Sequence, residues 1–152
     1  MSNTKQWGTP MWIFLHTFVA NINEVFFLKN RSEIFEIFSL IIDTIPCDYC
    51  KNHAQDYVKK HPFHRMQSKL HCVKYFIDFH NDVNKRLNKR NFDDVHIYRS
   101  YDIRNITVTF YNMVGIRRNS SKHMLDAQYR RASLKKVFDF VKTNIRYFQL
   151  PM

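Results

Sequence analysis

The chain has 152 residues, enough for one domain with a substantial hydrophobic core but too few for two ordinary domains. Hydrophobic residues make up 45% and aromatic residues 16%, which excludes a disordered protein, and two glycines leave no Gly-rich loop for a Rossmann or P-loop nucleotide site. The net charge of +11 would attract a polyanion, but the basic residues are scattered without an RNA-module motif, so nucleic acid is not the expected partner.

Hydrophobic periodicity predicts an all-α fold. Thr9 and Pro10 have the pattern of an N-cap followed by proline at the first helical position, so we expect a first helix from there to about Leu28. Ser32 has N-cap chemistry ahead of apolar residues spaced three and four apart, which predicts a second helix that stops before Pro46.

Two further helices are expected in the middle of the chain. The third begins near Pro46 or Cys47 and ends before Pro62, because a residue that precedes proline disfavours helical geometry. The fourth covers about Gln67 to Asn88, with its polar His80, Asn81 and Asn84 interrupting an apolar face. The predicted inward residues of that helix are Leu70, Val73, Phe76, Ile77, Val83 and Leu87.

The C-terminal part is predicted less regularly. A short helix is expected over 92–101, an extended segment over 105–111 from the alternation of Ile106, Val108 and Phe110, a polar hinge over 115–121, and a basic helix over 124–148. We therefore expect a helical domain over 1–104 and an extension over 105–152 that packs on it or mediates assembly. The apolar run Pro10 to Ile22 is too short and too polar to cross a membrane, and no secretory signal is evident, so we expect a cytoplasmic protein.

Cys47 and Cys50 carry the clearest chemical signal. Cysteines three apart at a helix start lie on one face and can form a disulfide, and the helix dipole is expected to lower a thiol pKa there. This pattern predicts a redox dithiol. No second Cys-x-x-Cys is present to take two electrons, so a bound cofactor is the simplest electron acceptor. Cys72 is interpreted as a lone structural thiol.

The cysteine pair has two alternative interpretations. A zinc site could use Cys47, Cys50 and His53, but the fourth ligand lacks metal-site spacing. Further candidate ligands are His61, His64, His71 and Cys72. A thioredoxin-like motif would need a preceding strand, whereas residues 38–45 continue a helical period. The alternative function is a basic module, with a structural or zinc-binding Cys-x-x-Cys, that binds nucleic acid or an acidic partner.

Three sequence blocks resemble the Erv/ALR family of FAD-linked sulfhydryl oxidases, especially its small viral members. They are Trp7-Gly8-Thr9-Pro10-Met11-Trp12-Ile13-Phe14-Leu15-His16-Thr17, Pro46-Cys47-Asp48-Tyr49-Cys50, and His80-Asn81-Asp82-Val83-Asn84-Lys85-Arg86-Leu87-Asn88-Lys89, the last continued by Phe92 and Asp93. The resemblance covers about 7–101. It implies a four-helix bundle with a short fifth helix that holds FAD among its helices.

The resemblance also implies the roles of individual residues. Cys47 would exchange with substrate thiols, Cys50 would pass electrons to the flavin, and oxygen would reoxidise the flavin to give hydrogen peroxide. The implied cofactor-binding residues are Trp7, Gly8, Thr9, Trp12, His16, His80, Asn81, Val83, Asn84, Lys89 and Tyr101, the last in place of a family tryptophan. The cations near Lys89, which are Lys85, Arg86 and Arg90, are interpreted as a charged helix face exposed to solvent.

The implied partners follow from what the chain lacks. Many family members carry a second, shuttle cysteine pair, which is missing here, so the substrate is expected to be a protein dithiol met directly or a separate dithiol shuttle protein. Molecular oxygen and a second copy of the chain, in a homodimer, are the other implied partners, and no metal is expected. Small size and a residue usage rich in Lys, Asn, Ile and Phe indicate a viral origin, with a location in the host cytoplasm or the virion.

Overall fold

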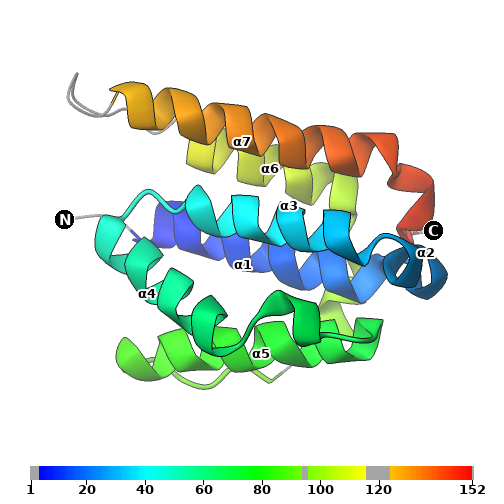
Figure 1. Cartoon of the computed structure of the whole chain (residues 1–152), viewed down its shortest axis with the longest axis horizontal. Helices are drawn as coiled ribbons and strands as arrows, with labels where there is room; N and C mark the ends of the chain where they lie inside the picture. Colours follow the sequence, from blue (N-terminus) through cyan, green and yellow to red (C-terminus); the bar gives the residue numbers. More distant parts are fainter. Residues whose placement is uncertain (1–3, 94–95, 116–123, 152) are drawn as a thin grey trace.

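The computed structural model describes residues 4–93, 96–115 and 124–151, and in these ranges the regular elements are all helices (Figure 1). The prediction of an all-α fold is confirmed. The α-helices are α1 (Thr4–Asn21), α2 (Glu24–Lys29), α3 (Arg31–Asp43), α4 (Asp48–Lys60), α5 (Lys69–Arg86), α6 (Ile103–Gly115) and α7 (Met124–Thr143). The short 3-10 turns are η1 (Phe63–Arg65), η2 (His96–Ser100) and η4 (Ile145–Tyr147).

The helices form three layers with α1 and α3 in the middle. In Figure 1, α6 and α7 lie on one side of this central layer and α4 and α5 on the other. The helix α1 packs against both α5 and α6, and α3 packs against both α4 and α7. Because α1 is covered on two sides, Phe14, Leu15 and Phe18 are completely buried. The central layer therefore carries the core, and it holds α4 and α5 in place.

The predicted first helix is wrong at both ends. The helix α1 begins at Thr4 and contains Pro10 in its interior. It ends at Asn21, and Asn23 caps the separate helix α2 by accepting a hydrogen bond from the Phe26 amide (2.8 Å). The break is made by the distant C-terminal segment, because the Gln149 amide donates to the carbonyl of Asn21 (2.8 Å).

The helices α3 and α4 lie within a few residues of their predicted places. The helix α4 starts one residue after Cys47 and ends before Pro62, as expected. The helix α3 starts at Arg31, after Asn30, so the predicted N-cap Ser32 lies inside the helix.

The predicted inner face of α5 is partly wrong. Leu70 and Leu87 are 76% and 49% exposed, whereas Tyr75 and Phe79 are buried. The buried face of α5 is the one that carries Tyr75 and Phe79, because Phe79 stacks on Tyr57 of α4 with ring centres 4.3 Å apart.

The predicted extended segment over 105–111 is helical. The buried residues Ile103, Thr107, Phe110 and Val114 recur at helical spacing, and Val108 of the apparent alternation is 46% exposed. The helix α7 ends at Thr143 and η4 follows, so the predicted last helix is slightly too long. Of the predicted hinge, residues 116–121 lie outside the described ranges.

The predicted boundary between domain and extension falls inside α6, which begins at Ile103. None of the helices in the described ranges has both the length and the apolar character needed to cross a membrane.

Candidate active site

The two cysteines of the Cys-x-x-Cys motif meet at the start of α4. Cys47 is the N-cap residue, and its sulfur accepts a hydrogen bond from the Cys50 amide (3.3 Å). The two sulfur atoms are 2.7 Å apart, and both residues are thiols that are partly buried. The local helix geometry therefore brings the pair within reach of a disulfide.

The predicted lowering of the thiol pKa is wrong for Cys50 in this dithiol state. Burial raises the pKa of Cys50 to about 12, and the hydrogen bond and charge of Cys47 act in the same direction. The backbone amide of Cys50 and the guanidinium of Arg86 oppose this rise but do not overcome it. Two sulfurs this close do not both carry a negative charge, so the two thiols of the dithiol are not deprotonated together.

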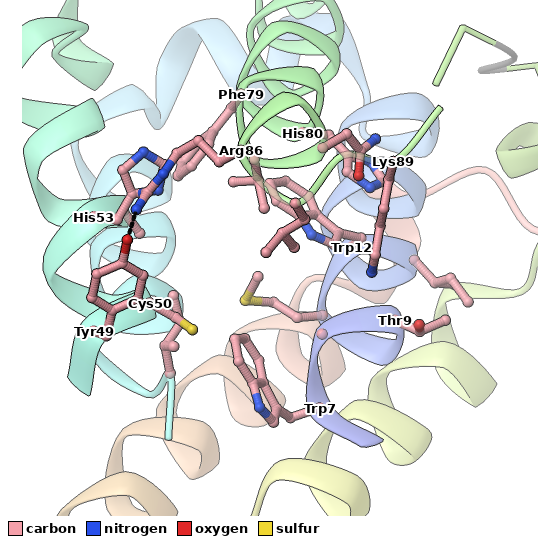
Figure 2. Close-up of a pocket in the computed structure, with 18 of the residues that line it drawn as sticks. Trp7, Thr9, Trp12, Tyr49, Cys50, His53, Phe79, His80, Arg86 and Lys89 are labelled. Carbon is pink, nitrogen blue, oxygen red and sulfur yellow. Dashed lines mark hydrogen bonds between the residues drawn. The ribbon is translucent and has the colours of Figure 1, made fainter. Parts of the chain in front are cut away.

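A cavity of about 300 Å³ lies beside Cys50, and Figure 2 shows the sulfur of Cys50 pointing into it. The residues that line it come mainly from α1, α4 and α5: Trp7, Gly8, Thr9, Met11, Trp12, Ile13, Ile45, Tyr49, Cys50, His53, Ala54, Phe79, His80, Val83, Asn84, Arg86, Leu87, Lys89 and Tyr98. Cys47 is not in this set. The dithiol thus has one sulfur that faces the cavity and one that does not.

Flat rings form one wall of the cavity. Trp12 of α1 stacks on His80 of α5 with ring centres 4.2 Å apart and planes 5° apart. Behind them, Nε2 of His16 lies 2.9 Å from Nδ1 of His80, and the His16 ring also contacts Phe92 and Tyr98. Such a wall suits a flat aromatic ligand.

The two histidines of this wall are neutral at pH 7. Burial lowers the pKa of His16 to about 3 and that of His80 to about 4. In a hydrogen bond between two neutral imidazoles, one ring nitrogen donates and the other accepts. Because Nδ1 of His80 is engaged with His16, its Nε2 is the atom left for a ligand in the cavity.

The indole of Trp7 lines the cavity and carries a buried polar group. The residue is 5% exposed, and its indole N–H has no hydrogen-bond partner among the described residues. A buried donor without a partner costs about 1–3 kcal/mol, so an acceptor on a bound group would stabilise the site. The indole N–H and the flat wall together fit a ring system with polar edges, such as a flavin.

The structure brings most of the predicted cofactor-binding residues together. Lining the cavity are Trp7, Gly8, Thr9, Trp12, His80, Val83, Asn84 and Lys89. His16, Asn81 and Tyr101 do not line it. His16 supports His80 from behind, and Tyr101 packs edge-on against Tyr98 with ring centres 5.3 Å apart.

Asn81 is hydrogen-bonded to the backbone of Phe92. Its side-chain amide donates to the carbonyl of Phe92 (2.8 Å), and its oxygen accepts from the Phe92 amide (2.6 Å). Asn81 therefore ties the segment after α5 back onto that helix and keeps Phe92 against the histidine pair. Direct contact of Asn81 with a cofactor stays a prediction.

Sequence reasoning missed three polar residues at the cavity. Tyr49 and His53 lie on α4 with Cys50, and Arg86 on α5 was interpreted as part of a solvated face. His53 also pairs with Asp82 of α5 (3.2 Å). The helical spacing of His53 and Cys50 was a usable signal, whereas the position of Arg86 depends on how α5 faces α4.

The zinc alternative gains no support from the described ranges. Within them, no three His, Cys, Asp or Glu side chains are grouped so that they could hold a metal ion. In particular, His53 is engaged with Asp82 rather than grouped with the two cysteines as a ligand set.

Comparison with known proteins identifies the family. The model of the Erv1 / Alr family matches residues 9–102. The chain is 31% identical over 100 residues to the putative FAD-linked sulfhydryl oxidase 096R of Invertebrate iridescent virus 3. This alignment covers 65% of this chain and 68% of that protein. It is 33% identical over 84 residues to the FAD-linked sulfhydryl oxidase of African swine fever virus, covering 55% and 70% of the two chains. It is 26% identical over 98 residues to FAD-linked sulfhydryl oxidase ERV2 of Saccharomyces cerevisiae, covering 64% and 50%.

No solved structure matches the chain significantly. The family match nevertheless includes α4, α5, most of α1 and both cysteines. The chain therefore belongs to the Erv1 / Alr family.

Proposed function

We propose that the chain is an FAD-dependent sulfhydryl oxidase that forms disulfide bonds in protein thiols. The observation that carries this proposal is the asymmetry of the dithiol. The sulfur of Cys50 faces a cavity with a flat aromatic wall, and Cys47, 2.7 Å away from it, lies outside that cavity. A substrate can therefore react at one sulfur while the other faces an electron acceptor.

Thiol exchange explains the work of the two cysteines. A substrate thiolate attacks the sulfur of Cys47 in the Cys47–Cys50 disulfide, so a substrate–Cys47 bond forms and Cys50 leaves as a thiolate. A second substrate thiolate attacks the substrate sulfur of this mixed disulfide, which releases the substrate disulfide and Cys47. The two substrate thiols give two protons to solvent, Cys47 and Cys50 take up two protons from it, and the pair of electrons remains in the Cys47–Cys50 dithiol.

The cavity residues fit FAD as the group that accepts this electron pair. Trp12 and His80 provide a flat face, Trp7 offers a buried N–H, and Lys89 brings a positive charge that suits a diphosphate. Bound FAD would supply the two-electron acceptor and the reaction with oxygen that gives hydrogen peroxide.

Two measurements on the purified full chain test the proposal. We expect the yellow absorbance of oxidised flavin, and oxygen consumption when a dithiol is added. The variants Cys47→Ser and Cys50→Ser should lose at least about 99% of turnover while they retain flavin, because either change removes the disulfide that drives exchange. Cys72→Ala is the matched control, since it removes a buried thiol outside the cavity and should leave turnover intact. A chain that binds no added FAD, or a Cys50→Ser variant that still turns over, would contradict the proposal.

The partners belong to the same proposal. The substrate would be a protein dithiol or a separate dithiol shuttle protein, and the protein would act in the host cytoplasm or the virion. A homodimer stays a prediction. The chain's own α6 and α7 lie against α1 and α3, so a second copy would have to use another surface.

A further inference from the structure

Arg86 and Tyr49 form a bridge between α5 and α4 next to the dithiol (Figure 2). The Nη2 group of Arg86 donates a hydrogen bond to the hydroxyl of Tyr49, and the guanidinium carbon lies 5.1 Å from the centre of the Tyr49 ring. Tyr49 directly precedes Cys50 in the chain, and both bridge residues line the cavity into which Cys50 points. The bridge therefore holds a guanidinium, which is always charged, at the wall that carries the reactive sulfur.

The other charged or titratable groups of the cavity are placed less well to compensate a charge on Cys50. On α4, His53 is engaged with Asp82, which is itself an anion on α5. On α5, burial lowers the pKa of His80 to about 4, so this ring is neutral at pH 7. The ammonium of Lys89 lies toward Thr9 of α1 in Figure 2, away from α4. The segment of α1 that lines the cavity contributes no charged side chain, and Tyr98 is the remaining titratable group.

We propose that Arg86, held in place by Tyr49, is the counter-ion of the Cys50 thiolate that forms when the Cys47–Cys50 disulfide opens. This role rests on the proposed oxidase function and adds a positioning pair to it. In the step concerned, the substrate sulfur forms a bond to Cys47, the Cys47–Cys50 bond breaks, and the electron pair of that bond stays on the sulfur of Cys50. Stabilising this thiolate makes Cys50 a better leaving group.

The electrostatics of the dithiol agree with this assignment. Burial raises the pKa of Cys50, and Arg86 is the side chain whose charge acts to lower it. Arg86 is exposed, so solvent and salt screen its effect. The resulting influence on Cys50 is moderate in size and depends on ionic strength.

Titration of Cys50 by alkylation tests the proposal without flavin or oxygen. In the full chain carrying Cys47→Ser and Cys72→Ala, Cys50 is the remaining thiol, and its rate of reaction with iodoacetamide as a function of pH reports its thiolate. We expect Arg86→Gln to shift this titration upward by about 0.5–1 pH unit at low salt, with a smaller shift at high salt. Arg86→Lys should recover most of the shift, and Tyr49→Phe, which keeps the ring but removes the acceptor, should give an intermediate shift.

Lys85→Gln is the matched control, because it removes the neighbouring exposed cation of α5, which does not line the cavity. An unchanged titration in Arg86→Gln, or an equal shift in Lys85→Gln, overturns the proposal, and a circular dichroism spectrum of each variant verifies that it is folded. In the enzyme with all three cysteines, Arg86→Gln should slow the opening of the disulfide by a dithiol roughly 2- to 3-fold at neutral pH.

The outcome separates this inference from the proposed function. If the chain consumes oxygen with a dithiol but Arg86→Gln does not shift the pH at which Cys50 titrates, the counter-ion role alone is wrong. If Arg86→Gln shifts the titration but the chain neither binds FAD nor consumes oxygen, the oxidase function is wrong while Arg86 still stabilises the thiolate.

Discussion

The indole N–H of Trp7 connects the stability of the protein with the binding of its cofactor. It is buried in the cavity wall without a hydrogen-bond partner among the described residues, which is a cost that a ligand acceptor can remove. We predict that Trp7→Phe, which keeps an aromatic ring but lacks the donor, weakens FAD binding by about 1 kcal/mol, or roughly 5-fold.

The flavin-free protein provides the internal control for this variant. Trp7→Phe removes a buried donor that has no partner but also some buried ring contacts, and because these two effects oppose each other the free energy of unfolding without flavin should change little. FAD titration followed by flavin fluorescence and urea unfolding of the flavin-free form give the two values. Unchanged affinity for FAD would show that the Trp7 N–H does not contact the cofactor.

The pair His16 and His80 predicts how stability depends on pH. Their pKa values are lowered from 6.5 to about 3 and about 4, so below pH 6.5 the unfolded chain binds protons that the folded chain excludes. The free energy of unfolding should therefore fall as the pH is lowered from 6.5 toward 4, by up to roughly 1.4 kcal/mol per pH unit for each ring.

Urea unfolding at several pH values measures this dependence. His16→Gln should reduce the slope between pH 6.5 and 4, because it removes one of the two buried rings. His64→Gln, at an exposed position of η1, is the control and should leave the slope as it is. Equal slopes in the original chain and in His16→Gln would mean that the pair is accessible to protons when folded.

At the scale of single elements, two serines show how a helix cap predicted from the sequence can differ from the cap in the structure. Ser68 caps α5 and accepts a hydrogen bond from the amide of His71 (3.0 Å), whereas Ser32, the predicted cap of α3, lies exposed inside that helix. We predict that Ser68→Ala lowers the free energy of unfolding by about 1 kcal/mol, because the cap bond is lost.

Ser32→Ala should be neutral or slightly stabilising, since alanine is the better helix former at an exposed interior position. Thermal or urea unfolding of both variants decides the matter. If Ser32→Ala were the more destabilising change, the start of α3 would be set by Ser32 and not by Asn30.

At the scale of the whole molecule, we propose that α6 and α7 are a structural part of the helical domain rather than an appended segment. Phe110 of α6 stacks on Phe14 of α1 with ring centres 4.9 Å apart, and Phe140 of α7 lies near Phe18, with ring centres 6.2 Å apart. These aromatic contacts join the C-terminal helices to the same core that supports the cavity.

The proposal predicts the effect of a large-to-small change in α6. Phe110→Ala should lower the free energy of unfolding by about 3–5 kcal/mol, because Phe110 is 1% exposed. Val108→Ala, at a site that is 46% exposed, is the control and should change it by less than about 0.5 kcal/mol. Both tryptophans of the chain, Trp7 and Trp12, lie in α1, so tryptophan fluorescence reports on the part outside α6 and α7. If this signal unfolds at the same urea concentration in Phe110→Ala and in the original chain, the extension is a separate unit.

Local patterns were sufficient for the two ends of α4 and favoured a redox dithiol there. The start of α4 next to Cys47 and its end before Pro62 follow from backbone chemistry within a few residues, and Cys-x-x-Cys at that place favours redox exchange over zinc binding. The family resemblance of the three sequence blocks implied most of the cavity residues, and the spacing of His80 and Asn84, one turn apart on α5, agrees with it. Features that depend on residues within one or two helical turns of each other could be predicted from the sequence.

The remaining features depend on contacts between segments that are distant in the sequence. The C-terminal segment ends α1 at Asn21, and the packing of α6 on α1 turns an apparent strand pattern into a helix. The pKa of Cys50 is raised because the fold buries this thiol beside Cys47, which outweighs the backbone hydrogen bond and the charge of Arg86. The sequence alone determined the helical class and favoured redox chemistry at the cysteine pair, and the family resemblance implied that Cys50 faces the cofactor. The tertiary structure decided how far Cys50 is buried and that Arg86 lines the same cavity. The physical reason is that burial and electrostatic surroundings are set by the packing of whole helices, which no local pattern specifies.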